Sequence, residues 1–278
     1  MPCYLSHKKY MDEQSVQKNS LTVPIAIVIA GVLIAGALYL SRGGSTQPAT
    51  SQGQDTQAQP TVNREIIVRP VSTRDHILGN PDAPVGFIVY TDLECPFCKS
   101  FHNTMHKITD AYGKDGKVAW VYRSFPLPQL HPKAPAEAVA TECVSMLAGN
   151  TAYWSYVDSL FQITPSNNGL DLAELPKLAK NLNIDESRFT ACSTDEKNTA
   201  AVQKDYEEAI SAGGQGTPFS VIVSAKPLNV LTLNKIKTLT TQYPPDTFVF
   251  STDNKRIAMS GALPYETVSQ VIEAILAN

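Results

Sequence analysis

The sequence predicts an α/β domain that carries an inserted all-helical subdomain and follows one N-terminal transmembrane helix. Three observations predict this arrangement. Val23–Leu40 is an apolar run without a charged residue. Residues 85–122 show a strand, a helix and a second strand in succession, which is typical of the parallel crossover unit of an α/β sheet. A long helical region, about 131–213, then separates this unit from the strands that follow.

The composition excludes several broad classes of protein. The chain has 278 residues, of which 43% are hydrophobic and 18% are charged, as in a globular protein rather than a disordered or collagen-like one. Lys and Arg total 23 against 26 Asp and Glu, so the net charge is −3. A charge this small generates no field that would attract nucleic acid, and we expect no nucleic-acid partner. The 5 cysteines are too few for a small disulfide scaffold, so their positions matter more than their number.

The apolar run is long enough to cross a membrane. Its eighteen residues would form about 27 Å of helix, and the segment 21–41 would span a bilayer core of about 30 Å. Three lysines precede this segment, whereas Arg42 is the nearby basic residue after it. The positive-inside rule therefore places residues 1–20 in the cytoplasm and the rest of the chain outside.

A cleaved signal peptide and a buried soluble helix are the alternatives. A signal peptide has a shorter apolar region that ends in small residues, and Ser41–Gly44 is a poor cleavage site. A buried helix is disfavoured because the polar, weakly charged segment 42–63 follows directly and has the composition of a flexible linker. The sequence thus predicts a single-pass protein of the cell membrane. Its folded domain, 64–278, would lie in an extracytoplasmic compartment where disulfides persist.

The first part of this domain alternates strand and helix patterns. We expect a short strand at Glu65–Val71 and a central strand at Val85–Thr91, whose nearly continuous apolar residues suit burial on both faces. A helix is predicted for Pro96–Tyr112, with Gly113 at its end, and a strand for Val118–Tyr122.

Helical patterns fill the insertion, and strands return after it. The insertion holds a helix from Pro135 to Gly149, a segment around Trp154, a third from Asp171 with its capping partner Glu174, and a fourth that ends at Gly213. After it we expect a strand at Phe219–Val223, a hairpin of Thr247–Ser251 with Arg256–Ser260, and a last helix from Pro264. The segment 224–246 carries the pattern of a short extra helix.

Cys95-Pro96-Phe97-Cys98 is the most informative site in the sequence. It lies between the predicted central strand and the first residues of a helix. Unpaired backbone N–H groups and the helix dipole stabilise an anion at that position, so the pKa of the Cys95 thiol should be lowered. Cys98, about one turn later, can close a disulfide with Cys95. We expect Cys95 to be the exposed nucleophile and Cys98 the shielded resolving cysteine.

An inert structural disulfide and a metal site are the alternatives for this pair. His102 and His106 follow Cys98 on the same predicted helix. Tetrahedral zinc sites normally take ligands from two separate segments, so we interpret these histidines as helix-surface or core residues and predict no metal site.

Two further features lie downstream. Thr217-Pro218 follows a glycine-rich turn and begins a strand, where either a cis or an ordinary trans proline would fit. Cys143 and Cys192 lie in the helical insertion and are predicted to form a structural disulfide, the alternative being two free buried thiols. Cys3 remains as a free cytoplasmic thiol without an assigned role.

Residues 64–278 resemble the DsbA-like thiol–disulfide oxidoreductases of the thioredoxin superfamily, in particular their membrane-anchored relatives. The resemblance rests on the Cys-Pro-Phe-Cys motif after a central strand, on Thr217-Pro218 about 120 residues later, and on the helical region between them, which residues 125–132 lead into. It implies a thioredoxin fold with an inserted helical subdomain. It also implies Cys95 as nucleophile, Cys98 as resolving cysteine, and substrate contacts at Thr217, a cis Pro218, Pro96 and Phe97.

The sequence departs from that family at three places. The dipeptide between the cysteines is Pro-Phe rather than Pro-His, which removes one stabiliser of the thiolate. Val89 stands where the family often has a buried acid, so Asp92, Glu94 or water would have to relay protons. The segment 224–246 is longer than the connection in relatives.

The leading functional hypothesis is an extracytoplasmic oxidase that introduces disulfides into exported proteins with cysteine pairs. Such an enzyme needs no cofactor, and a quinone-linked oxidase of the membrane would reoxidise it. A reductase or isomerase that a membrane donor keeps reduced is the alternative enzyme. A tethered module that binds exported chains without catalysis is the alternative outside enzymes.

Overall fold

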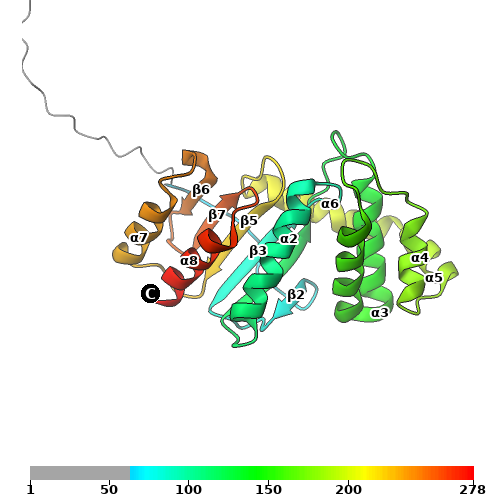
Figure 1. The fold of residues 1–278 in the computed structure, drawn as a ribbon, viewed down its shortest axis with the longest axis horizontal. Coiled ribbons are helices and arrows are strands. Elements are labelled where there is room, and N and C mark those ends of the chain that lie inside the picture. Colours follow the sequence, from blue (N-terminus) through cyan, green and yellow to red (C-terminus); the bar gives the residue numbers. More distant parts are fainter. Residues whose placement is uncertain (1–62) are drawn as a thin grey trace, which may run out of the picture. The chain divides into compact units, whose positions relative to one another are not determined.

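The computed structural model describes residues 63–278, and the elements below are those of this range (Figure 1). Its strands form one seven-stranded sheet in the order β1-β6-β7-β5-β3-β4-β2. The strands are β1 (Asn63–Arg64), β2 (His76–Gly79), β3 (Val85–Thr91), β4 (Val118–Ser124), β5 (Phe219–Ser224), β6 (Phe248–Ser251) and β7 (Arg256–Ser260). The central strand β3 runs parallel to β4 and antiparallel to β5.

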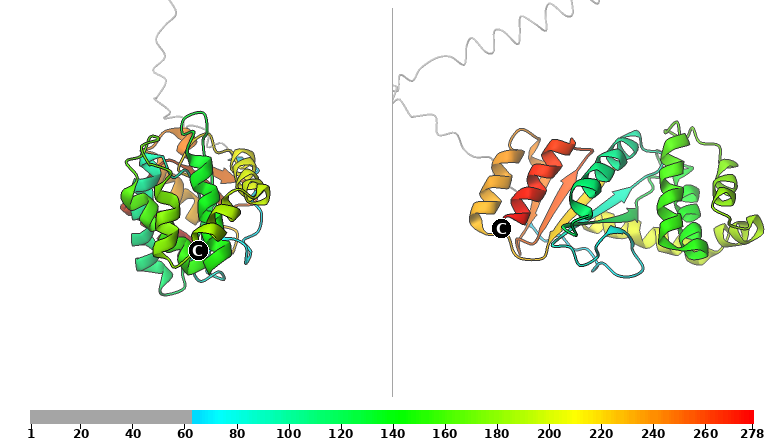
Figure 2. Two further views of the ribbon diagram at one scale, coloured as in Figure 1. Left: turned by 90° about the vertical axis from the view of Figure 1, so that its right-hand side faces the viewer. Right: turned by 60° about the horizontal axis from the view of Figure 1, so that its bottom comes forward.

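Helices cover the sheet and build the insertion. They are α2 (Pro96–Ile108), which continues as the π-helix η1 (Thr109–Gly113), α3 (Ala134–Ile163), α4 (Glu174–Asn181), α5 (Glu186–Ser193), α6 (Glu196–Ser211), α7 (Val230–Thr240), the short 3₁₀ helix η2 (Pro245–Thr247) and α8 (Tyr265–Leu276). Figure 1 shows α2 and α8 in front of the sheet and α6 behind it. The right view of Figure 2 shows α3, α4 and α5 at one end of the sheet.

The apolar pattern of β3 explains its central position. Phe87 and Val89 pack in one buried cluster with Phe101 of α2, whereas Ile88 and Tyr90 pack in a second cluster on the α6 side. Because successive side chains of a strand point to opposite faces, a strand buried on both faces must be apolar throughout. The predicted strand Val85–Thr91 is therefore confirmed with its predicted bounds.

Most other predicted elements are also found. The helix after the cysteine motif, the strands at 118, 219 and 256, the hairpin and the last helix all appear within a few residues of their predicted positions. The extra helix expected in 224–246 is α7, whose Leu233 and Ile236 are buried. The two predicted helices on either side of Gly149 are joined as α3, with non-helical backbone at that glycine.

The predicted strand Glu65–Val71 is wrong. The edge strand is β1, which pairs in parallel with β6, and residues 65–71 are irregular. The backbone N–H of Arg69 donates to the Glu208 carboxylate of α6 instead of to a neighbouring strand. Side chains explain why this segment does not join the sheet, because Asp75 and Glu208 both form ion pairs with the fully buried Arg123 of β4. A buried guanidinium requires such partners, so they determine the path of this segment.

Two further elements differ from the sequence predictions. The strand β2, which pairs antiparallel with β4, was not predicted, because four residues that include a histidine give no strand pattern. The helix expected from Asp171 begins at Glu174 instead. Asp171 accepts a hydrogen bond from the N–H of Ala173 and forms a turn before the helix.

The N-terminal predictions fall outside the described residues. These are the cytoplasmic segment 1–20, the transmembrane segment 21–41 and the linker 42–63 except for Asn63, which lies in β1. Across residues 63–278, none of the helices has the length and apolar character needed to cross a bilayer.

A disulfide joins Cys143 of α3 to Cys192 of α5 and closes a loop with a sequence separation of 49. The side chain of Asn198, in the first turn of α6, donates to the carbonyl of Cys192 at 2.8 Å. The bond thus fastens the small helices α4 and α5 to the long helix of the insertion.

Replacing both Cys143 and Cys192 with alanine should lower the free energy of unfolding by up to about 4 kcal/mol, because the unfolded chain regains the entropy of a loop of this length. Urea denaturation of the full chain under non-reducing conditions measures the change. Cys3→Ala is the control and should leave the midpoint in place. An unchanged midpoint in the double variant would show that the bond contributes nothing to stability.

Candidate active site

The cysteine motif lies at the junction between the central strand and helix α2. Cys95 is the N-cap residue of α2, with extended backbone, and Pro96 occupies the first helical position. Proline suits that position because its missing N–H would have no partner there. The backbone N–H groups of Phe97 and Cys98, at the start of the helix, contribute to lowering the pKa of the Cys95 thiol. Local sequence thus directs unpaired helix donors at one thiol.

Both thiols are reduced in this structure, and they differ in exposure. Cys95 retains 5% of its accessible surface and Cys98 1%. The more exposed of the two is Cys95, the expected nucleophile, and the less exposed is Cys98, the expected resolving cysteine. Cys95 is nevertheless buried, whereas the sequence led us to expect an exposed sulfur. The reason is the loop before β5, whose Thr217 carbonyl oxygen lies 3.4 Å from the Cys95 sulfur and accepts a hydrogen bond from it while the thiol is protonated. Pro96 and Phe97 project into solvent beside the pair, and Phe97 is 66% exposed.

Thr217 and Pro218 are brought to the motif from 122 residues away. The peptide bond between them is cis, and Pro218 is buried while Thr217 is half-buried. The preceding turn requires glycine at 213, where φ is +101° and a Cβ atom would lie 1.8 Å from the guanidinium of Arg64. All four of the residues named as substrate contacts from the sequence therefore lie around the cysteine pair.

The two thiols have opposite acidities. A hydrogen bond from Cys98 is the largest cause that lowers the pKa of Cys95, to about 6; burial opposes it, and donors from Thr217, Cys98 and Phe97 add to it. Burial raises the pKa of Cys98 well above its ordinary value, and the neighbouring Cys95 raises it further. At neutral pH the pair therefore consists of a Cys95 thiolate and a Cys98 thiol that donates to it. Only a thiolate attacks or leaves in disulfide exchange, so the arrangement gives the two sulfurs distinct roles.

Asp92 and Glu94, the two acids considered as proton relays in place of an acid at Val89, are both buried near the pair. Asp92 is 1% exposed, and its carboxylate contacts the Nδ1 atom of His131 at 2.9 Å. The fully buried Glu94 accepts hydrogen bonds from the backbone N–H groups of Asn168 and Leu170. Glu94 thus anchors the loop after α3, whereas Asp92 adjoins Cys98 through its own backbone N–H.

Glu137 was missed by the sequence reasoning. It lies in the first turn of α3, where an acid is ordinarily a solvent-exposed partner of the helix dipole. Here it is fully buried, and its carboxyl oxygens have no hydrogen-bond partner among the described residues. Burial, together with the nearby charges of Glu94 and Asp92, raises the pKa of Glu137 to about 9, so it is protonated at neutral pH. The neighbouring sequence gives no signal for this burial, since an acid is a usual residue in the first turn of a helix.

His102 and His106 do not contact the cysteines. Their Nε2 atoms lie 2.7 and 2.8 Å from Oδ1 of Asp158, in the second half of α3. This acid was not singled out from the sequence. Together the three side chains could hold a metal ion.

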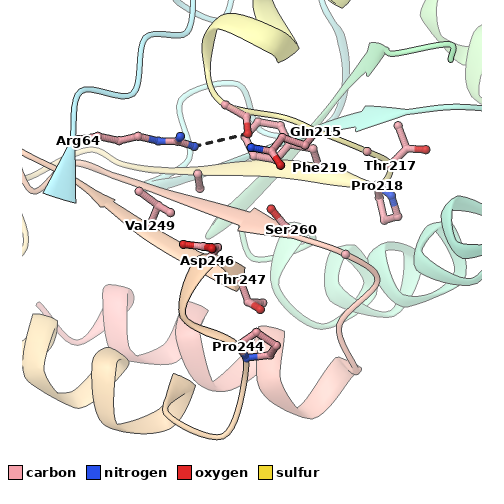
Figure 3. A pocket seen from close by; sticks show the side chains of 14 residues that line it. Arg64, Gln215, Thr217, Pro218, Phe219, Pro244, Asp246, Thr247, Val249 and Ser260 are labelled. Atoms are coloured by element: carbon pink, nitrogen blue, oxygen red, sulfur yellow. Dashed lines mark hydrogen bonds between the residues drawn. The ribbon is translucent and has the colours of Figure 1, made fainter. Parts of the chain in front are cut away.

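A cavity of about 540 Å³ opens beside the cis proline (Figure 3). Figure 3 shows Thr217 and Pro218 at one end and Arg64 at the other. Pro244 and Asp246, from the segment between α7 and β6, line it as well. The cavity therefore provides a groove next to the reactive pair for part of a larger molecule.

Comparison with known proteins gives the same fold. The family model described as thioredoxin matches residues 72–239. Among solved structures, DsbA2 of Pseudomonas aeruginosa is 24% identical with a TM-score of 0.52, and the match covers 72% of this chain and 93% of that one. The oxidised BdbD of Bacillus subtilis is 19% identical with a TM-score of 0.58 and coverages of 79% and 100%. These matches confirm, for the described residues, the predicted thioredoxin fold with a helical insertion.

Curated relatives match over a shorter range. The Na⁺/H⁺ antiporter NhaA 3 of Salinispora tropica is 30% identical over 154 residues, which are 55% of this chain and 22% of that protein. The antiporter NhaA 1 of Mycolicibacterium gilvum is 32% identical over 132 residues, or 47% and 20%. The chain thus spans about a fifth of the length of these relatives.

The acidity of Cys95 can be tested by alkylation. In a Cys3→Ala background, the rate at which reduced protein reacts with iodoacetamide should rise with pH through an inflection at about 6, because the thiolate is the reactive form. Cys98→Ala removes the largest cause of the lowered pKa and should move the inflection toward that of an ordinary thiol. Cys98→Ser keeps a donor and should show a smaller movement. An inflection that stays in place in Cys98→Ala would contradict the assigned cause.

The buried acid Glu137 should make stability depend on pH. Its pKa is raised in the folded protein, so its contribution is fully present below the pKa of the unfolded chain and is lost as pH rises toward about 9. Relative to the parent, Glu137→Gln should gain up to about 1.4 kcal/mol per pH unit across this window. Urea denaturation at pH 5, 7 and 9 measures it, with Glu186→Gln, an exposed acid in the first turn of α5, as control. A difference that does not change with pH would contradict the raised pKa.

Proposed function

This chain belongs to the thioredoxin family, and from that premise we propose that it is a protein-disulfide oxidoreductase that introduces disulfide bonds into exported proteins. The observation that carries the proposal is the unequal pair of thiols at the start of α2. Cys95 has a lowered pKa of about 6, Cys98 has a raised one, and the Thr217 carbonyl lies 3.4 Å from the sulfur of Cys95.

The proposed reaction begins with the oxidised pair. A substrate thiolate attacks the sulfur of Cys95, the Cys95–Cys98 bond breaks, and the Cys98 thiolate that leaves takes up a proton because its pKa is high. A second substrate thiolate then attacks the substrate sulfur of this mixed disulfide. The Cys95 thiolate leaves readily because its pKa is low. The substrate has lost two electrons and gained a disulfide, and the two electrons remain on the Cys95/Cys98 pair.

The lowered pKa of Cys95 favours oxidation of substrates over their reduction. A stabilised thiolate stabilises the reduced form of the pair, and a pair whose reduced form is stable is a strong oxidant. A pKa of about 6 lies between the values of about 7 in thioredoxin and about 3.5 in DsbA. We therefore infer a potential between those of the two proteins.

The cavity beside Pro218 suits an extended substrate segment. Its walls combine apolar surface at Pro218 and Val249 with the charged groups of Arg64 and Asp246. Backbone groups at Thr217 would pair with the substrate chain, while the exposed ring of Phe97 would cover an apolar residue beside its cysteine. The cavity thus favours proteins with accessible cysteines rather than small thiols.

The cellular arrangement is part of the proposal. The apolar segment 21–41 and the preceding lysines support a single-pass protein of the cell membrane with an extracytoplasmic catalytic domain. Each turnover leaves the pair reduced, so an electron acceptor is required. We infer a quinone-linked oxidase in the same membrane as the partner that restores the disulfide.

The test is oxidative folding by the full chain in detergent. The oxidised protein should form disulfides in reduced ribonuclease, Cys95→Ser should abolish this activity, and Cys3→Ala should retain it. Titration of the pair against glutathione should give a potential between about −120 and −270 mV. A potential near −270 mV would overturn the oxidase in favour of a reductase, and failure to exchange with any dithiol would overturn the enzyme altogether.

A further inference from the structure

A second polar cluster lies on α2 beyond the cysteine pair. His102 and His106, one turn apart on that helix, meet Asp158 of α3, and the three possible ligand atoms all lie within 4.8 Å of one another. Both imidazole Nε2 atoms contact the same carboxylate oxygen, at 2.7 and 2.8 Å, and they lie 3.1 Å from each other. Two elements of the chain thus bring three ligand atoms to one point.

Hydrogen bonding does not account for all three contacts. A neutral imidazole carries one N–H, and the carboxylate can only accept. If both Nε2 atoms donate to Asp158, two N–H groups face each other at 3.1 Å, and if only one donates, the other nitrogen faces the carboxylate oxygen with a lone pair. A cation at the centre would satisfy all three lone pairs at once.

The geometry is close to that of a bound metal ion. Ligands about 2.0–2.1 Å from a tetrahedral ion lie about 3.3–3.4 Å apart, so the three atoms need to separate by about 0.2–0.7 Å. Asp158 has room to move, since its side chain is 45% exposed. His102 is held in place, because its ring packs against Trp120 at 5.0 Å and Phe161 at 4.6 Å between centroids.

The buried side of the His102 ring leaves its tautomer open. Its Nδ1 atom has no hydrogen-bond partner among the described residues, so no neighbouring group determines which ring nitrogen carries the proton. The proton can therefore lie on Nδ1, which leaves the lone pair of Nε2 for a metal ion.

The cluster can be reached from solvent. It lines a cavity of about 290 Å³ with Asn103 and Gln162, which leaves space for a water molecule as a further ligand. Lys99 lines the same cavity, but its ammonium group donates to the carbonyl of Thr164 at 2.7 Å.

We propose that His102, His106 and Asp158 bind a divalent transition-metal ion, for which Zn²⁺ is the probe. Two imidazoles and one carboxylate suit zinc and its neighbours rather than calcium or magnesium, which prefer oxygen ligands. The ion joins α2 to α3 and so fastens the helix that carries the cysteines to the helical insertion. The site has no part in the exchange reaction and is separate from it.

Binding of Zn²⁺ is the direct test. The full chain, without an affinity tag, is used with its active pair oxidised and Cys3 alkylated, so that no thiol competes for the metal. Equilibrium dialysis should give one zinc per chain. His106→Ala and Asp158→Asn should each weaken binding by at least about tenfold, since even loss of an outer partner of a ligand costs that much. Asp110→Asn, an exposed acid next to the same helix, is the control and should bind as the parent does.

Two further measurements keep the outcome independent of folding. Stoichiometric Zn²⁺ should raise the unfolding temperature of the parent and of Asp110→Asn but not of Asp158→Asn, because a ligand stabilises only the state that binds it. Co²⁺ should give a visible absorption band that His106→Ala lacks. Absence of zinc binding at micromolar concentrations, or equal binding by parent and by both ligand variants, would overturn the site. Equal stabilisation by Ca²⁺ and Zn²⁺ would overturn the assigned class of metal.

Discussion

The chemistry of this molecule depends on one junction, where the buried central strand β3 ends and α2 begins at Cys95. The strand fixes the position of the helix, and the first residues of the helix direct backbone N–H groups at one sulfur. Because the strand is buried on both faces and paired on both edges, this junction cannot shift without disturbing the whole sheet. Thr217 lies in the loop before β5. Because β5 pairs with β3, this loop is held at the same junction.

Three acidic side chains lie in the interior behind that junction, and each has different surroundings. Glu94 remains bonded to backbone N–H groups, Asp92 faces His131, and Glu137 is held in its neutral form. A neutral acid next to charged ones limits the negative potential around the thiols. An additional charge there would oppose the formation of a thiolate at Cys95 and make the reduced pair less stable.

Sequence reasoning succeeded where the determining interactions are local. The run at Val85–Thr91, the proline after Cys95 and the turn between β6 and β7 specify their conformations within a few residues. It failed where side chains that are distant in the sequence determine the conformation. Residues 65–71 have the sequence pattern of a strand. The carboxylate of Glu208, more than a hundred residues later, nevertheless accepts a hydrogen bond from the N–H of Arg69. Likewise, nothing near Asp158 or Glu137 indicates that one meets two histidines and the other is buried without a partner.

The position of Arg64 at the start of the domain has a mechanical consequence. Its side chain lines the cavity beside Pro218, donates to the carbonyl of Ala212 at 3.4 Å and lies against Gly213. The chain therefore joins the domain at the rim of the groove and is coupled to the loop that carries Thr217. A displacement of Arg64 would therefore disturb the turn at Gly213 and, with it, the backbone that carries Thr217 to the sulfur of Cys95.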